Sequence, residues 1–137
     1  MRKCAAAGYP IRAVVMPIIP VEGWECMYAD FLRDLIASVP IERLTLGGIC
    51  SYRDARALMD RKLGPRNDIS GNLQTMGKAG DGRIRYAPSV RTLLYKQLIA
   101  VARSVRPDLD IALCLEERAL WEDAGLATAI GRCNCVL

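Results

Sequence analysis

Cysteine is the residue type with the most distinctive chemistry in this 137-residue chain, which has six of them. Only Cys133 and Cys135 are close in sequence, and a C-x-C pair supplies two ligands where structural zinc or an iron–sulfur cluster requires four. These two are therefore candidate redox or metal residues whose ligand set is incomplete. Cys26, Cys50 and Cys114 lie among apolar residues and are expected in the core. The wide spacing does not fit the disulfide framework of a small secreted domain, so we expect reduced thiols.

Histidine is absent from the sequence. Mechanisms that need an imidazole as base or ligand are therefore excluded from this chain alone. The excluded classes include hydrolase triads and histidine-based acid–base catalysis.

Basic residues are concentrated between positions 78 and 106, where seven basic side chains and one acidic side chain give a net charge of +6 in a chain of net charge +4. If residues 83–87 form a strand, alternation places Arg83 and Arg85 on one face and Ile84 and Tyr86 on the other. Such a strand can hold phosphates while the aromatic ring contacts bases. A solvated helix face beside a basic loop is the alternative explanation, because the net charge is modest.

The elements that position these residues follow from apolar periodicity. Buried strands are predicted at 11–18, 44–49 and 110–115. Helices are predicted from residue 28 to Pro40, at 52–63, where Ser51 and Asp54 resemble a capping box, and at 88–105. A short helix is predicted around 117–123. The helix at 88–105 is expected to turn five residues inward, namely Val90, Leu94, Leu98, Val101 and Val105. Residues 67–87 are predicted to be a loop and hairpin insertion, with residues 69–75 pairing with 83–87.

Strands that alternate with helices predict parallel βα units. Three fully buried strands make an incomplete sheet, because two of them are edges with unpaired backbone groups. The chain is therefore expected to be a single domain that forms half of a larger barrel or sheet.

The carboxyl ends of such strands are the usual ligand sites. The first strand ends in a segment stiffened by Pro17 and Pro20, which either is a rigid loop or holds a site open with Glu22 as its carboxylate. Gly47 and Gly48 end the second strand, and close packing is the alternative to ligand approach. No apolar run is long enough to span a membrane and the amino terminus lacks a secretory pattern, so a cytoplasmic protein is expected.

The stretch AAAGYPIRAVVMPIIPVEGWECMYADFLRDL (residues 5–35) resembles the spore photoproduct lyase family of radical S-adenosylmethionine (SAM) enzymes. In that family a helix ending in A-x-A-G-Y-P leads into a strand ending in A-P-I or M-P-I, followed by E-G-W. The segments LTLGGICSYRDARALMDRKLG, GDGRIRYAPSVR and GRCNCVL are similar to a branch of the family found outside spore formers.

The resemblance implies the carboxyl half of a partial (β/α)6 barrel with a hairpin insertion. Family members bind a [4Fe–4S] cluster through C-x-x-x-C-x-x-C, cleave SAM to a 5′-deoxyadenosyl radical and repair cross-linked thymines in DNA. By similarity, Val15, Met16 and Pro17 line the cofactor or lesion site, and Arg83, Arg85 and Tyr86 match a DNA-holding hairpin. The cluster motif is not among the cysteines here, so the chain is expected to be inactive alone and to need a missing amino-terminal half.

Three hypotheses follow from these patterns. The first is the carboxyl part of a radical SAM DNA repair lyase whose partners are DNA and the missing half. The second is a stand-alone nucleic-acid-binding module without catalysis. The third is a thiol or metal tail centred on Cys133 and Cys135.

Overall fold

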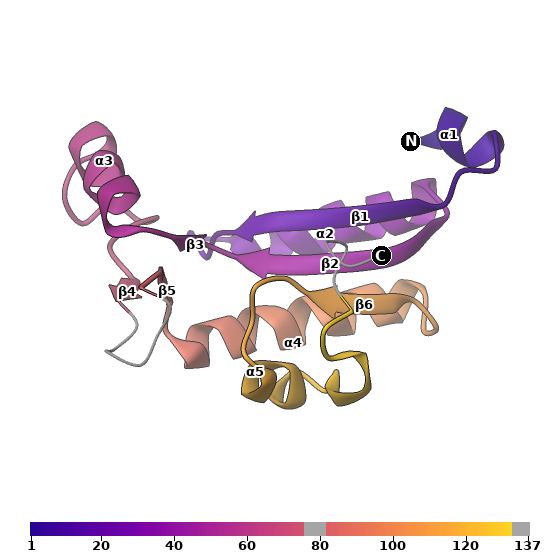
Figure 1. The fold of residues 1–137 in the computed structure, drawn as a ribbon. Coiled ribbons are helices and arrows are strands. Elements are labelled where there is room, and N and C mark those ends of the chain that lie inside the picture. The colour runs from indigo at the N-terminus through magenta and orange to yellow at the C-terminus, as the bar shows by residue number, and fades with distance from the viewer. Residues whose placement is uncertain (76–81, 133–137) are drawn as a thin grey trace.

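A parallel three-stranded sheet is the centre of the fold (Figure 1). The computed structural model describes residues 1–75 and 82–132. The strands β1 (Ile11–Ile18), β2 (Ile41–Gly48) and β6 (Asp110–Leu113) lie in the order β1-β2-β6, and both pairings are parallel. The predicted parallel α/β arrangement is confirmed, and the sheet formed by the described residues is open.

One face of this sheet is covered by α2 (Trp24–Ser38) and α4 (Pro88–Val105), which also contact each other. Leu44 of β2 pairs with Ala13 on one side and Ile111 on the other, so these side chains share a face. They belong to the main hydrophobic core together with residues of both helices. The core extends to α5 (Arg118–Asp123) and η1 (Ala127–Ala129), whereas α1 (Arg2–Ala6) has no buried residue.

The opposite face of the sheet is open at β1. Val14 is 54% exposed and Met16 37%, while their face neighbours, Thr45 on β2 and Ala112 on β6, are buried. The prediction that every strand is buried on both faces is therefore wrong for β1. The reason is that no helix lies over this face of β1 among the residues that the structure describes.

A second, antiparallel sheet lies beyond the carboxyl end of β2 (Figure 1). It consists of β3 (Cys50–Ser51), β5 (Ile84–Tyr86) and β4 (Leu73–Thr75), with β5 in the middle. The predicted pairing across the 67–87 insertion is confirmed, although β3 was not expected. Helix α3 (Arg53–Leu63) follows β3, has no buried residue and projects from the body of the chain.

Several predicted boundaries and local features are wrong. Helix α2 begins at Trp24 rather than at residue 28, β2 begins at Ile41, and β6 ends at Leu113. Ser51 does not cap α3, because it pairs with Ile84 in β3 and the cap residue Tyr52 makes no side-chain capping bond.

The buried face of α4 also differs from the prediction. Val105 is 38% exposed, whereas Arg91 and Tyr95 are buried between the expected apolar positions. The apolar pattern could not reveal this, because the two polar side chains are buried by contacts with distant acidic residues.

None of the helices within the described ranges is long and apolar enough to cross a membrane.

Candidate functional site

A largely apolar cavity of about 620 Å³ lies at the carboxyl ends of β1 and β2. Its walls come from the end of β1, from the segment after β2 and from one side of α3. The lining residues are Met16, Pro17, Gly48, Ile49, Cys50, Ser51, Ala55, Leu58, Met59, Lys62 and Leu63. The volume lies within the range of small-molecule sites, and the position is where parallel α/β sheets bind ligands. Lys62 is the charged residue of this lining.

Gly47 and Gly48 bring the carboxyl end of β2 close to other parts of the chain. A Cβ atom at Gly47 would lie 2.9 Å from Sδ of Met16 and 3.3 Å from Cβ of Cys114. At Gly48 the nearest atom would be the Tyr95 hydroxyl oxygen, at 3.4 Å. Close packing within the chain, the simpler of the two interpretations, therefore accounts for Gly47, whereas a Cβ at Gly48 would make only an ordinary contact.

Arg83 connects the second sheet to the cavity. Its Nη1 donates to Sγ of Cys50, a cavity-lining residue, over 3.7 Å. Its guanidinium lies over the ring of Tyr52, with Cζ 5.8 Å from the ring centroid. This distance is within the range of cation–π attraction. Arg83 therefore fixes an exposed aromatic ring beside the cavity wall.

A buried ionic cluster lies on the other side of the second sheet. Arg91, 1% exposed, pairs with Glu116 and with Oε2 of Glu117 at 3.0 Å, and its Nε donates to the Tyr86 carbonyl at 2.9 Å. Arg85 pairs with Oε1 of Glu117 at 3.3 Å. The cluster therefore links α4, β5 and the segment after β6.

Tyr95 extends this cluster to β2. Its hydroxyl donates to Glu116 and accepts the Gly48 N–H over 2.8 Å. Burial, with the charge of Glu116 as a second cause, raises the pKa of Tyr95 well above its usual value. Tyr95 is therefore a neutral phenol. Its hydroxyl links the backbone at the carboxyl end of β2 to the buried carboxylate of Glu116 through two hydrogen bonds.

The pKa values of the two acids in the cluster are shifted in opposite directions. Burial raises the pKa of Glu116, and the hydrogen bond from Tyr95 and the charge of Arg91 only partly offset this effect. Burial also acts to raise the pKa of Glu117, but the hydrogen bond from Arg91 and the charges of Arg91 and Arg85 outweigh it and lower this pKa overall. Arg91 is thus the cation that pairs with both carboxylates.

The predicted cofactor residues are only partly brought together at the cavity. Met16 and Pro17 line it, and their peptide bond is cis. Val15 is buried in the main core and lies outside this lining, because alternation along β1 turns its side chain toward the helices. Glu22 is exposed and does not line the cavity.

The predicted DNA-contacting residues differ in accessibility. Arg85 is 6% exposed and bound to Glu117, and Tyr86 is 0% exposed and donates its hydroxyl to the Ile69 carbonyl at 3.0 Å. Ile84 is buried as well and packs with Tyr86 in a small apolar cluster, whereas Arg85 pairs with Glu117, so the two faces of β5 differ as predicted but both are covered. Arg83 is the one of the three predicted residues that reaches solvent.

Cysteine placement corrects one further expectation. Cys114 is buried as predicted and Cys50 is half-buried, but Cys26 is exposed because it lies on the outer side of α2. Cys133 and Cys135 lie outside the described residues. Within the described ranges, the acidic and cysteine side chains form no group of three that could hold a metal ion.

The sequence patterns do not identify Tyr52 or the partners of Arg91. Arg91 belongs to a basic run, and the acidic pair at the end of the third strand, in CLEE, is the sequence signal for its partner. Tyr52 stands at the start of a helix, and no sequence signal links it to Arg83.

The fold and the site define an α/β protein whose cavity lies at the carboxyl edge of an open parallel sheet. Its fold is similar to solved structures of spore photoproduct lyase. In the complex with dinucleoside spore photoproduct, the TM-score is 0.65, the identity 21%, and the match covers 82% of this chain and 36% of that chain. A cysteine-to-alanine variant with the same dinucleoside gives a TM-score of 0.67 at 21% identity, with the same coverage of both chains. A cysteine-to-serine variant gives 0.64 at 22% identity, again with the same coverage.

The expected resemblance is therefore confirmed at the level of the fold, and the chain spans about a third of the length of the lyases it matches. No protein-family model matches the sequence. No curated protein matches it significantly.

Proposed function

We propose that this chain is the carboxyl-terminal part of a radical SAM DNA repair enzyme related to spore photoproduct lyase, in which it forms part of a (β/α)6 barrel wall. The observation that carries the proposal is the coincidence of two features. The fold matches the lyases over 82% of the chain, and the cavity lies at the carboxyl edge of the parallel strands. Ligands of α/β barrels bind at this edge.

The cavity fits the adenosyl part of SAM. Met16, Pro17 and Ile49 offer apolar surface to a flat heterocycle. When bound, SAM supplies the 5′-deoxyadenosyl radical in this family. The residues of this chain would bind and orient it and exclude water from the apolar walls.

The described residues do not fit the [4Fe–4S] cluster. Cys4, Cys26, Cys50 and Cys114 form no ligand group, and cluster binding requires several thiolates in close proximity. In this proposal the cluster ligands come from an amino-terminal half. The open face of β1, where Val14 and Met16 are exposed, is the surface against which that half would pack.

A stand-alone nucleic-acid-binding module is the second candidate function. The observation that favours it is the position of α3, an exposed helix that carries several basic residues and lies next to Arg83. Such a module would bind DNA without a companion half.

Association with a companion chain tests the first proposal. The reading frame encoded upstream should supply a segment with the C-x-x-x-C-x-x-C motif, and the two segments should co-purify. After anaerobic cluster reconstitution, the mixture should form 5′-deoxyadenosine from SAM, whereas the present chain alone should not.

Val14→Asp should abolish this association, because it places a charge on the open face of β1. Leu93→Asp is the matched control, since Leu93 is equally exposed, at 52%, but lies on α4. Absence of a cluster motif upstream, or equal effects of the two variants, would count against the proposal.

A further inference from the structure

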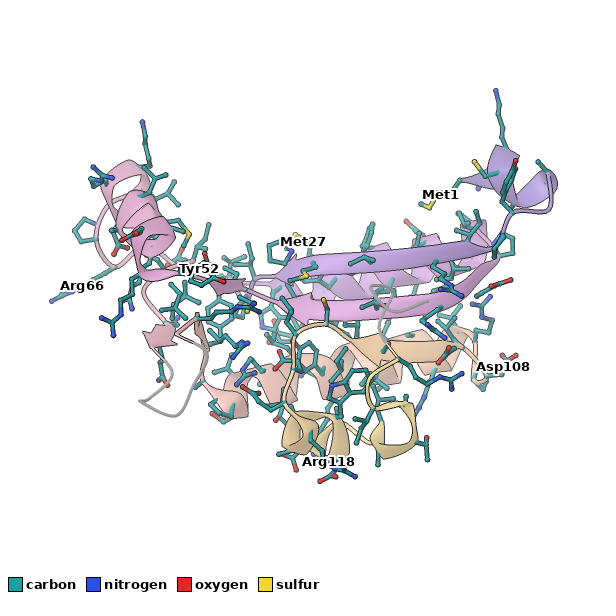
Figure 2. The ribbon with its side chains drawn as sticks, in the orientation of Figure 1. Met1, Met27, Tyr52, Arg66, Asp108 and Arg118 are labelled. Atoms are coloured by element: carbon teal, nitrogen blue, oxygen red, sulfur yellow. The ribbon has the colours of Figure 1, made fainter. Side chains whose placement is uncertain are left out.

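Tyr52 is an exposed aromatic residue at a junction between two elements. It lies between β3 and α3, as Figure 2 shows, and 58% of its surface is exposed. An isolated exposed tyrosine needs no explanation, but this ring is held on one side by the guanidinium of Arg83. Its position is therefore fixed relative to the cavity, since Arg83 also contacts Cys50 of the cavity wall.

The surface next to Tyr52 is positively charged. Residues 53–66 include five basic and two acidic side chains. One of the acids, Asp60, is already bound to Arg56 and Ser70. The exposed basic residues of this segment are Arg53, Arg61, Lys62 and Arg66. Figure 2 shows Arg66 directed away from the rest of the chain. These side chains and Arg83 are together named the cationic rim, and Lys62 is the member of this set that lines the apolar cavity.

An unpaired nucleotide has the chemistry that complements this arrangement. A base is flat and stacks on tyrosine or on an arginine plane, and the phosphates pair with basic side chains. A cationic rim alone would bind any polyanion. The aromatic ring held by Arg83 adds a requirement for a planar group.

We propose that Tyr52 and Arg83, beside the cavity, form a stacking platform for a base of a single DNA strand. Lys62 and the exposed arginines of residues 53–66 contact the flanking phosphates. The choice of DNA rests on the proposed function, whereas the platform itself rests on the geometry of Tyr52, Arg83 and the cavity. The interface is thereby centred on α3 and the edge of the second sheet rather than on the buried Arg85 and Tyr86.

Fluorescence anisotropy with the whole chain tests the proposal. The probes are a labelled ten-nucleotide oligothymidylate and a matched abasic strand with the same number of phosphates. Oligothymidylate should bind at least tenfold more tightly than the abasic strand. Tyr52→Ala should weaken oligothymidylate binding about 5- to 150-fold. Tyr52→Phe keeps the ring and should stay within about twofold of the unmodified chain.

The charge contribution is measured separately through salt dependence. Lys62→Ala should reduce the slope of log K against log salt by about 0.7, the value for one phosphate contact on a single strand. Lys96→Ala is the matched control, because Lys96 is exposed on α4 away from the cavity lining. Its slope should be unchanged. Far-UV circular dichroism of each variant confirms that the fold is kept.

Three results would overturn the platform. These are equal binding of the abasic strand, unchanged binding by a folded Tyr52→Ala variant, and no binding of oligothymidylate at low salt. None of them bears on the association of this chain with a cluster-binding half, so the two proposals fail separately.

Discussion

Replacement of Arg91 by methionine removes the cation from the buried cluster and leaves a side chain of similar length. The unmodified Arg91 is 1% exposed and the side chain of Glu116 only 3%. Removing one partner of a buried ion pair leaves an uncompensated charge and costs about 3–5 kcal/mol. Because a domain is stable by about 5–15 kcal/mol, we expect Arg91→Met to lose a large fraction of the free energy of unfolding.

The loss should depend on pH. The pKa of Glu116 is raised by burial, so this acid destabilises the fold once ionised and the cost is relieved as pH falls through its folded-state pKa. Removing Arg91 increases the free-energy cost of an ionised Glu116 in the folded chain, because the charge that partly offsets its burial is lost. The pKa of Glu117 is lowered overall because Arg91 and Arg85 outweigh its burial, and that stabilisation is lost in acid even in the unmodified chain. Both effects predict that the difference in the free energy of unfolding between Arg91→Met and the unmodified chain narrows from pH 8 to pH 4.

Urea unfolding followed by tryptophan fluorescence measures these quantities, since Trp24 and Trp121 are both buried. Arg103→Met, at an exposed position of the same helix, is the control and should change stability by less than about 0.5 kcal/mol. The double variant Arg91→Met, Glu116→Gln should recover most of the loss. A cost below about 1 kcal/mol for Arg91→Met, or a gap that does not narrow in acid, would refute this account of the cluster.

Two further variants probe the two sheets. Gly47→Ala should cost about 1–3 kcal/mol in urea unfolding, because the new Cβ meets Met16 and Cys114, and a second change of Met16→Ala should relieve most of it. If the double variant loses as much stability as Gly47→Ala alone, the contact between the new Cβ and the Met16 side chain is not the cause of the loss. Tyr86→Phe should cost about 1 kcal/mol near pH 7, because it leaves the Ile69 carbonyl without its donor. Burial raises the pKa of Tyr86 to about 12, so the unfolded chain ionises first and the unmodified chain loses stability above pH 10. The difference in the free energy of unfolding between the unmodified chain and Tyr86→Phe should therefore shrink between pH 10 and 12. A difference that stays constant would contradict the burial of this phenol.

Sequence patterns predicted the elements better than the site. The β-branched run from Ile11 to Ile18 and the helix Pro88–Val105 have the predicted bounds, because each is delimited by proline, glycine or a strong apolar period. The two-residue strand β3 is too short to have a pattern of its own. It is defined by pairing with Ile84 and Arg85, which are more than thirty positions away.

The candidate site could not be read from local patterns because its contacts join distant segments. Strand alternation predicted that Arg85 shares one face with Arg83 and could hold phosphates there. In the fold Glu117, 32 positions away, pairs with Arg85 and covers it. The number of basic residues likewise overstates the basic surface, since Arg91 is neutralised inside the protein by Glu116 and Glu117.

The edge position of β1 affects how the chain behaves in concentrated solution. β1 is an edge of this sheet in the part of the chain that the structure describes, and an edge strand can template the addition of another extended peptide. Pro17 removes one donor, and the pairing register shifts after Ile11 and again between Val15 and Ile18. The regular part of β1 is therefore confined to the short run Arg12–Val15, and Arg12 adds a charge to it. The irregular end of β1 that helps to line the cavity thus also limits fibril-like stacking of copies.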